Sequence, residues 1–177
     1  MKRNIIIIII LILCVWSVNS CGLSEETSTQ NVTIGNVIFT IPAELKMEDK
    51  SENSVMFKAR QDQIVGWILQ FSLFNVPSNI TEDADPEKNV GHAYQLMDGL
   101  INKQEGNSSG IQFDEYKKEM TMINDFPCIV LKATTGNMKW YEFVTYKVRK
   151  FSRMAFVAHI DDKEAEDVFD AIVESIR

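Results

Sequence analysis

Few residues of this chain have the type and spacing that covalent catalysis needs. Cys128 is a candidate nucleophile, and His92 and His159 are the two histidines of the sequence. A reactive cysteine needs a lowered thiol pKa and an accessible, electropositive setting. Cys128 instead starts an apolar, strand-like run in which Val130 shares its face, so we predict a buried and inert thiol. Because nothing in the spacing brings either histidine next to it, we expect no cysteine–histidine catalytic pair.

The acidic clusters have an interpretation that involves no metal ion. A calcium loop that starts at Asp83 needs glycine at its sixth position, where this chain has Lys88. Glu82–Asp85 is instead typical of the start of a helix, and Asp161-Asp162 of a helix cap. The sequence contains neither a P-loop nor a GxGxxG motif. We therefore predict no metal, no cofactor and no enzymatic activity, while an active site assembled only by the fold stays open as an alternative.

An aromatic and basic region is the best candidate for recognition of a partner. Residues 138–148 are apolar on both faces and include two adjacent aromatic residues. This pattern is typical of a central strand between two helices, and it also fits an exposed aromatic surface. Basic residues gather around the following turn, either as a solvated turn or as a patch for anionic headgroups or an acidic protein. The candidate interaction residues are Trp140, Tyr141, Lys147, Arg149, Lys150 and Arg153.

Two segments have the apolar spacing of amphipathic helices. We expect the first to be capped by Asp85, to begin at Pro86 and to stop near Gly106. We expect the second to follow a capping box of Asp161 and Glu164. Each carries a single apolar stripe, which must pack on a sheet. The stripes are Val90, Ala93, Tyr94, Met97, Leu100 and Ile101 in the first helix, and Ala165, Val168, Phe169, Ile172 and Ile176 in the second.

Period-two patterns predict an antiparallel sheet. A hairpin is expected around Gly35-Asn36, with pairing that ends at Pro42. The longest apolar run with a strand-like pattern, residues 64–76, is predicted to be a central strand. Further strands are expected at 54–59, 111–122, 128–134, 138–148 and 153–160. Together these patterns predict an α+β fold in which an antiparallel β-sheet is packed by helices.

Size and charge limit the classes of function. The chain has 177 residues, which is room for one domain, and a formal net charge of −7. An acidic composition disfavours a nucleic-acid partner, because phosphate neutralisation requires a clustered basic surface. We assign residues 32–177 to a single α+β domain. The polar, acidic segment 21–31 before it is typical of a flexible tether.

The N-terminal segment indicates export. Lys2 and Arg3 precede an apolar run, Ile5–Trp16. As a helix this run would span about 18 Å, well short of the roughly 30 Å of a bilayer core, which favours a signal peptide over a membrane-spanning helix. The run leads to Val18-Asn19-Ser20-Cys21, which resembles the lipobox of bacterial lipoproteins.

The lipobox resemblance implies that a signal peptide, residues 1–20, is removed and that Cys21 is acylated. The protein would then be anchored in a membrane of the cell envelope by its N-terminal lipid. Because Gly22 rather than aspartate follows the cysteine, the resemblance favours the outer membrane if the host is Gram-negative. An ordinary secretory signal that happens to precede a cysteine is the alternative.

The segment Ile38–Ala59, with the sequence IFTIPAELKMEDKSENSVMFKA, and the predicted order of elements resemble the Mog1/PsbP/DcrB-like superfamily. The resemblance implies a Mog1/PsbP-like sandwich. Members mostly act as non-catalytic assembly or binding modules, and none of their functional residues matches a motif here. We therefore expect a lipid-anchored, non-catalytic envelope protein that binds another envelope protein. An immunity or inhibitor lipoprotein against a toxin and an enzyme of unrecognised type are the alternatives.

Overall fold

The computed structural model describes residues 28–59, 67–76, 85, 88–105 and 112–177. These residues form an α+β fold of antiparallel strands and two helices, as the sequence patterns predict. The strands are β1 (Thr29–Ile34), β2 (Val37–Pro42), β3 (Leu45–Lys50), β4 (Ser54–Ala59), β5 (Ile68–Asn75), β6 (Glu115–Ile123), β7 (Phe126–Thr135), β8 (Met138–Lys147) and β9 (Lys150–His159). The helices are α2 (Val90–Glu105) and α3 (Ala165–Glu174).

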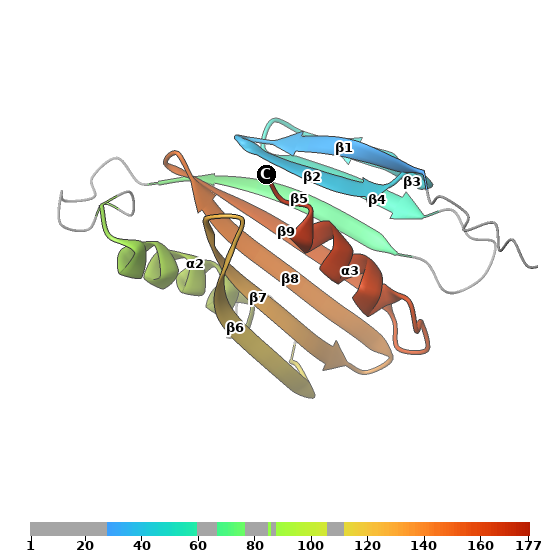
Figure 1. The fold of residues 1–177 in the computed structure, drawn as a ribbon. Helices are drawn as coiled ribbons and strands as arrows, with labels where there is room; N and C mark the ends of the chain where they lie inside the picture. The colour runs from blue at the N-terminus through green and yellow to red at the C-terminus, as the bar shows by residue number, and fades with distance from the viewer. Residues whose placement is uncertain (1–27, 60–66, 77–84, 86–87, 106–111) are drawn as a thin grey trace, which may run out of the picture.

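The strands form one hairpin and one large sheet (Figure 1). β1 pairs with β2, and the seven-stranded sheet has the order β3-β4-β5-β9-β8-β7-β6. β5, which lies in the apolar run of residues 64–76, is an interior strand between β4 and β9. β3 and β6 are the two edges of the large sheet, and β1 pairs with no strand except β2 among the described residues.

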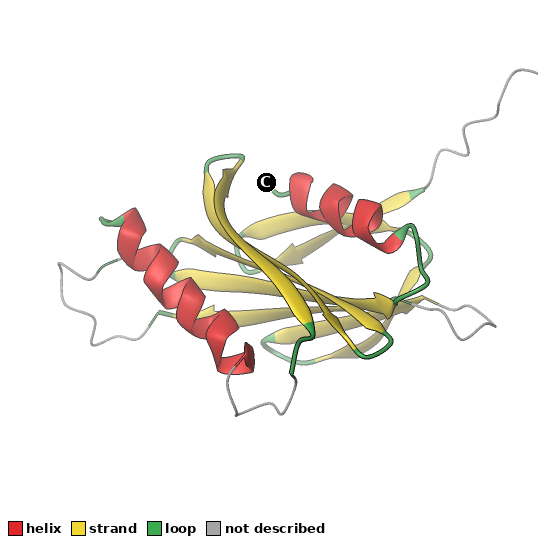
Figure 2. Ribbon diagram, turned by 90° about the horizontal axis from the view of Figure 1, so that it is seen from below, coloured by secondary structure: helices red, strands yellow, loops and turns green. Residues whose placement is uncertain are grey.

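Both faces of the large sheet are covered (Figures 1 and 2). On one face, the β1–β2 hairpin and α3 share a hydrophobic core that contains Phe39, Phe143 and Phe169. On the other face, α2 packs on β7 and β8, and Met97 lies in a second core with Val144. Alternate residues of β8 therefore belong to different cores, because side chains alternate between the faces of a strand. This is the physical reason why residues 138–147 are apolar on both faces.

Tight turns join most neighbouring strands. Gly35 and Gly136 have positive φ angles of 62° and 56°, in the two turns that the glycines predict. The Asn124-Asp125 turn between β6 and β7 also lies in the left-handed region, with φ of 48° and 68°. The β8–β9 turn is Val148-Arg149, with φ of 48° and 58°. The prediction that the strand continues through Val148 is therefore wrong by one residue.

The hairpin and the strand after it differ in how well the sequence predicts them. β2 ends at Pro42, which pairs with Thr29, in agreement with the prediction. β3 was not predicted. It carries one buried residue, Leu45, followed by five exposed ones, so its sequence has no period-two alternation. Its pairing with β4 also contains a bulge between Met47 and Asp49.

Helix α2 begins later than its sequence predicts. Its first residue is Val90 rather than Pro86, and the Asn89 side chain accepts a hydrogen bond from the Gly91 N–H at 2.9 Å. Val90 is 50% exposed, whereas the Ala93, Met97 and Ile101 side chains of the predicted stripe are fully buried. The predicted stop at Gly106 lies outside the described residues.

Helix α3 has the predicted apolar stripe but a different cap. Asp162 Oδ1, and not Asp161, accepts hydrogen bonds from the N–H groups of Glu164 and Ala165 at 3.0 and 3.1 Å. The other carboxylate oxygen of Asp162 accepts the indole N–H of Trp67 at 2.8 Å. One side chain therefore starts the helix and ties it to the beginning of β5.

Candidate binding site

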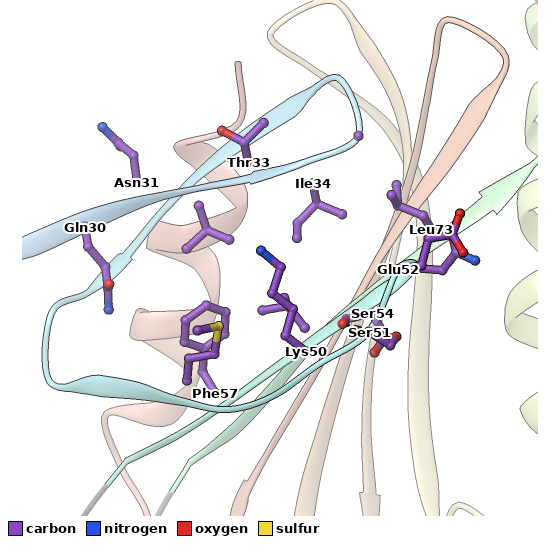
Figure 3. A pocket seen from close by; sticks show the side chains of 15 residues that line it. Gln30, Asn31, Thr33, Ile34, Lys50, Ser51, Glu52, Ser54, Phe57 and Leu73 are labelled. Carbon is purple, nitrogen blue, oxygen red and sulfur yellow. Dashed lines mark hydrogen bonds between the residues drawn. The ribbon is translucent and has the colours of Figure 1, made fainter.

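A groove of 480 Å³ lies between β1 and the β3–β4 hairpin (Figure 3). Its inner wall is apolar, because alternation directs one side of each strand towards the core. Ile34, Val55 and Phe57 are buried there, and Val32 and Leu73 pack partly against the same core. The groove therefore offers an apolar surface that is continuous with the hydrophobic core.

Polar groups close the two ends of the groove. At one end, Gln30 Nε2 donates hydrogen bonds to the carbonyl oxygens of Leu45 at 2.8 Å and Pro42 at 3.3 Å. At the other end lies the loop 51–53 between β3 and β4. The ammonium end of Lys50 lies inside the groove, below β1 (Figure 3). Among the described residues, it has no carboxylate partner.

The backbone of β1 borders the groove with an unpaired edge. In a two-residue hairpin the residues that flank the turn exchange hydrogen bonds, and the pairs then alternate. For the Gly35-Asn36 turn, this alternation directs the backbone groups of Ile38 and Thr40 in β2 away from β1. Ile38 exchanges two backbone hydrogen bonds with Arg177, at 2.9 and 3.1 Å, and the Thr40 N–H donates to Ser175 Oγ at 2.8 Å. No β2 residue lines the groove. The outer edge of β1, with the N–H and C=O of Asn31 and Thr33, is therefore the edge beside it.

The polar groups of the groove are hydroxyls, amides and two ionisable side chains. Its hydroxyl groups come from Thr33, Ser51 and Ser54, and its ionisable side chains are Lys50 and Glu52. No histidine or cysteine is among its lining residues, all of which the structure describes. A hydroxyl nucleophile needs an adjacent general base that is itself held in place. The lining supplies apolar contacts, hydrogen-bonding groups, the positive charge of Lys50 and the negative charge of Glu52.

The two aromatic candidates for recognition lie on opposite faces of β8. Tyr141 is 3% exposed and stacks on Phe169 of α3 with ring centroids 5.0 Å apart. Trp140 is half-buried on the α2 face, 6.3 Å from the Phe113 ring, and its Nε1 donates to Glu142 Oε2 at 3.2 Å. These two residues do not form a shared exposed aromatic surface.

The basic candidates also separate. Lys147 Nζ lies 4.5 Å from the centre of the Phe126 ring, and Arg149 Nη1 pairs with Asp85 at 3.2 Å across the β8–β9 turn. Arg153 points to the α2 face of the sheet, where its Nε pairs with the fully buried Glu142. Lys147, Arg149 and Lys150 therefore remain together at the turn, and Arg153 belongs to the interior.

A lone acidic residue inside an apolar run was the sequence signal for this buried pair. Glu142 is the one carboxylate in the run Trp140–Tyr146, and it is completely buried. Burial of an isolated charge is costly unless a partner neutralises it. Arg153 on the neighbouring strand is that partner. This pairing was not predicted from the sequence.

Cys128 is buried, as the alternation around it predicts, and the two histidines lie elsewhere in the fold. The Cys128 side chain is fully buried, and its Sγ lies 3.2 Å from the Phe126 carbonyl oxygen and 3.6 Å from Thr145 Oγ1. Burial raises the pKa of its thiol to about 11. His159 Nδ1 accepts the Asp161 N–H, and His92 Nδ1 is buried on α2 without a hydrogen-bond partner. Among the described residues, neither histidine hydrogen-bonds to Cys128.

Of the first acidic cluster only Asp85 lies in the described residues, and its carboxylate pairs with Arg149. Glu82, Asp83 and Ala84 lie outside the described residues, while the Asp85 carbonyl oxygen accepts the N–H groups of Lys88 and Asn89 at 3.0 and 3.1 Å. In the part of the chain that the structure describes, no three histidine, cysteine, aspartate or glutamate side chains are grouped so as to hold a metal ion.

One catalytic sequence motif, at residues 106–110, was not among the predicted features. Gly106, Ser108 and Gly110 spell G-x-S-x-G, the pattern of a serine nucleophile elbow. An elbow sits between a strand and the helix that follows it. Here the pattern follows helix α2 and precedes strand β6, which is the reverse context. The residues themselves lie outside the described part.

A second cavity, of 350 Å³, lies beside β6, β7 and α3. Lys132 Nζ in it lies 2.8 Å from both Glu166 Oε1 and Asp170 Oδ2 of α3. Burial acts to lower the pKa of Lys132, but the hydrogen bonds to Asp170 and Glu166 outweigh it and raise the pKa. Burial, with the negative charge of Glu166, raises the pKa of Tyr141 to about 12. This cavity holds satisfied ion pairs and a phenol that stays protonated.

The predicted signal peptide, residues 1–20, and the lipidation site Cys21 lie outside the described residues, as does most of the tether 21–31. The last three residues of that predicted tether, Thr29–Asn31, belong to strand β1. Within the described residues, neither helix has the length and hydropathy to cross a bilayer.

Comparison with known proteins identifies the fold. No family model and no curated protein matches the chain. The solution structure of cyanobacterial PsbP (CyanoP) from Synechocystis sp. PCC 6803 is similar, with a TM-score of 0.56 and 16% identity over 89% of this chain and 96% of that one. A Pseudomonas aeruginosa protein of unknown function, PA94, matches with a TM-score of 0.48 and 9% identity over 83% of this chain and 94% of its own. A Bacteroides thetaiotaomicron protein matches with a TM-score of 0.42 and 10% identity, over 85% and 48% of the two chains. The similarity to CyanoP shows that this chain has a PsbP-like fold.

Proposed function

We propose that this protein is a lipid-anchored, non-catalytic component of a bacterial cell envelope that binds an extended segment of a partner protein. The groove between β1 and the β3–β4 hairpin is the proposed site. The observation that carries the proposal is the unpaired edge of β1 beside an apolar wall. An extended peptide that adds to a strand edge gains main-chain hydrogen bonds, and its alternate side chains reach adjacent pockets.

The groups around the groove define the ligand. The Asn31 and Thr33 backbone groups would bond to the incoming strand, and its inward side chains would contact the apolar wall at Val32 and Val55. The ammonium of Lys50 favours a carboxylate on the same segment. We therefore propose a partner segment that alternates apolar residues and contains one acidic residue.

The lipid anchor supports the same function through geometry. Cys21 precedes Ser28 by seven residues, which reach at most about 25 Å when extended. Acyl chains at Cys21 would therefore hold β1, and the groove beside it, close to a membrane surface. Two or more acyl chains anchor a protein stably, since each buried methylene contributes about 0.8 kcal/mol. The Mog1/PsbP/DcrB-like resemblance, whose members mostly act by binding, agrees with this role.

The groove is tested by cross-linking in intact bacterial cells. A photoreactive residue in place of Met47, which is exposed and lines the groove, should give one adduct with an envelope protein. Lys50→Glu should reduce that adduct about tenfold, since it removes the attraction for a carboxylate. Lys46→Glu is the matched control, because Lys46 is exposed on the same strand but does not line the groove. Equal adducts in both variants would refute the assignment of the site, and an adduct with a toxin would identify an immunity protein.

The anchor is tested by fractionation and mass spectrometry. Cys21→Ser should move the protein from the membrane fraction to the soluble fraction and remove the mass of the acyl chains. Cys14→Ser is the control, because Cys14 lies in the segment that the proposal removes. A native protein that begins at Met1, or that carries a free thiol at Cys21, would contradict the proposal.

A further inference from the structure

The edge strand β6 exposes apolar side chains on one face. Tyr116, Met120 and Met122 are 60%, 57% and 52% exposed, and they are three of the eight large hydrophobic side chains exposed in the described residues. They alternate along the strand, so they share a face with Lys118, which pairs with Asp98 of α2 at 2.8 Å. Apolar side chains gathered at an unpaired sheet edge are typical of an interaction surface.

The backbone of β6 can bond to a further strand through its even-numbered residues. The Asn124-Asp125 turn makes Ile123 and Phe126 the hydrogen-bonded pair next to the turn. The odd-numbered residues of β6 therefore bond to β7, by the alternation that also accounts for the outward groups of β2. The even-numbered residues from Tyr116 to Met122 direct their N–H and C=O groups away from the sheet.

We propose that two copies of this chain pair through β6 in an antiparallel arrangement, with the two-fold axis at Lys118. The outward N–H and C=O groups of two copies can bond only if even-numbered residues of one copy face even-numbered residues of the other. The numbers of two facing residues then add to an even sum, so the two-fold axis must pass through a residue and not between two residues. With the axis at Lys118, each Lys117 lies opposite Glu119 of the second copy. The two Lys118 residues then face each other at the axis, and each keeps Asp98 of its own α2 as counter-ion. An axis one residue to either side would place Lys117 opposite Lys117 or Glu119 opposite Glu119, and like charges directly opposite each other destabilise a sheet.

The charges of β6 match this self-pairing. Lys117 Nζ and Glu119 Oε1 lie 2.6 Å apart on the exposed face, and the hydrogen bond from Lys117 lowers the pKa of Glu119. In the dimer, two lysines and two glutamates alternate in sign around the axis. Charged residues on edge strands usually prevent pairing. Here Lys117 has Glu119 as its counter-ion and Lys118 has Asp98, so neither lysine repels a second copy as an unpaired charge.

The apolar side chains match as well. The same register places Tyr116 opposite Met120 of the second copy, twice, on the α2 face. Methionine sulfur makes favourable contacts with aromatic rings. The pairing therefore covers the two most exposed apolar side chains of the strand and joins the large sheets of two chains into one.

A disulfide test reports the register directly. The full chain, in detergent micelles, is oxidised and the dimer fraction is measured on a non-reducing gel. Lys118→Cys should cross-link, because facing residues in a hydrogen-bonded pair have Cα atoms about 5.5 Å apart, within disulfide reach. Met120→Cys is the matched control, since the two Met120 Cα atoms would lie about 14 Å apart in this register. The unsubstituted chain corrects for its native cysteines.

A charge-swap cycle tests the ion pairs without new cysteines. Lys117→Glu and Glu119→Lys should each weaken the dimer at least about tenfold in sedimentation at low salt, because each places like charges opposite each other. The double variant should restore the dimer, and circular dichroism verifies that all three variants stay folded. A chain that is monomeric at every concentration, a cross-link at Met120→Cys instead of Lys118→Cys, or a dimer that ignores the swaps would overturn the proposal.

Discussion

At the scale of single residues, desolvation controls the chemistry of Cys128. The thiol lies in the core beneath the β1–β2 hairpin and α3, and its Sγ is within 3.6 Å of Thr145 Oγ1. This hydrogen bond acts to lower the pKa, but burial outweighs it and raises the value from 9.0 to about 11. The alternation around Cys128 in the sequence predicts its burial. It could not show that Thr145, which lies opposite on β8, would be its polar neighbour.

The raised thiol pKa predicts a loss of stability at high pH. Below pH 9 the thiol is neutral in both the folded and the unfolded state, so it has no effect on the pH dependence. Between pH 9 and about 11, only the unfolded state releases the proton, and the free energy of unfolding should fall by about 2–3 kcal/mol. Urea unfolding of the wild type and of Cys128→Ala, measured with a reductant from pH 8 to 11, checks this. Parallel stability curves for the two proteins would contradict it.

The same scale shows why a cap can be misassigned. Asp161 and Asp162 are adjacent carboxylates, and the capping-box spacing to Glu164 selects Asp161. The structure selects Asp162, because its second oxygen also accepts the Trp67 indole N–H. A contact across 95 residues decided between two neighbours. Local spacing contains no information about such a contact.

At the scale of elements, the sequence predicts what is periodic and misses what is exposed. The hairpin at Gly35-Asn36, the stripes of both helices and the interior position of β5 follow from glycine turns and apolar spacing. β3 is missed because an edge strand with one buried side chain has no alternation to detect. The start of α2 is missed because Asn89 competes with Asp85 as a cap, and both residue types suit that position.

The β8–β9 turn contains a residue that does not suit it. Val148 has a φ of 48°, although β-branched residues strongly disfavour the left-handed region, and its side chain is 59% exposed. Val148→Asn should therefore stabilise the protein by about 1 kcal/mol, because asparagine tolerates this conformation. Val148→Ala, which also removes the β-branch but lacks the short polar side chain that lets asparagine tolerate this conformation, should gain less. The midpoints of urea unfolding decide the matter, and equal midpoints for Asn and Ala would remove the strain argument.

At the scale of the whole molecule, the candidate groove combines segments that the sequence keeps apart. β1, the β3–β4 hairpin and Leu73 of β5 come together because the β1–β2 hairpin lies over the large sheet. No residue of the groove was predicted as a site, since each one taken alone is an ordinary strand or loop residue. The surface around Trp140 and Tyr141, in contrast, was predicted as a site. Its aromatic pattern indicates a strand between two layers, and that alternative interpretation agrees with the burial of Tyr141.

The position of the hairpin depends on the last residues of the chain. Ile38 and Arg177 exchange two backbone hydrogen bonds, Thr40 N–H bonds to Ser175 Oγ, and the Ile176 side chain is fully buried in the same core. Deletion of residues 175–177 should thus destabilise the protein by at least about 2–5 kcal/mol, the usual cost of removing one large core side chain. The Ile38 and Thr40 amides should then exchange hydrogen faster than those of β8.

Arg177→Ala separates the backbone contribution from that of the side chain. This variant keeps both hydrogen bonds to Ile38 and the buried Ile176, and it loses the contact from Arg177 to the Asn31 side chain at 3.0 Å. Because that contact is exposed, the free energy of unfolding should change by no more than about 0.5 kcal/mol. The hydrogen exchange of the Ile38 amide should stay unchanged. If Arg177→Ala loosened the hairpin as much as the deletion does, the side chain rather than the backbone pairing would hold β2 in place. The β1 edge of the groove would then depend on a surface charge.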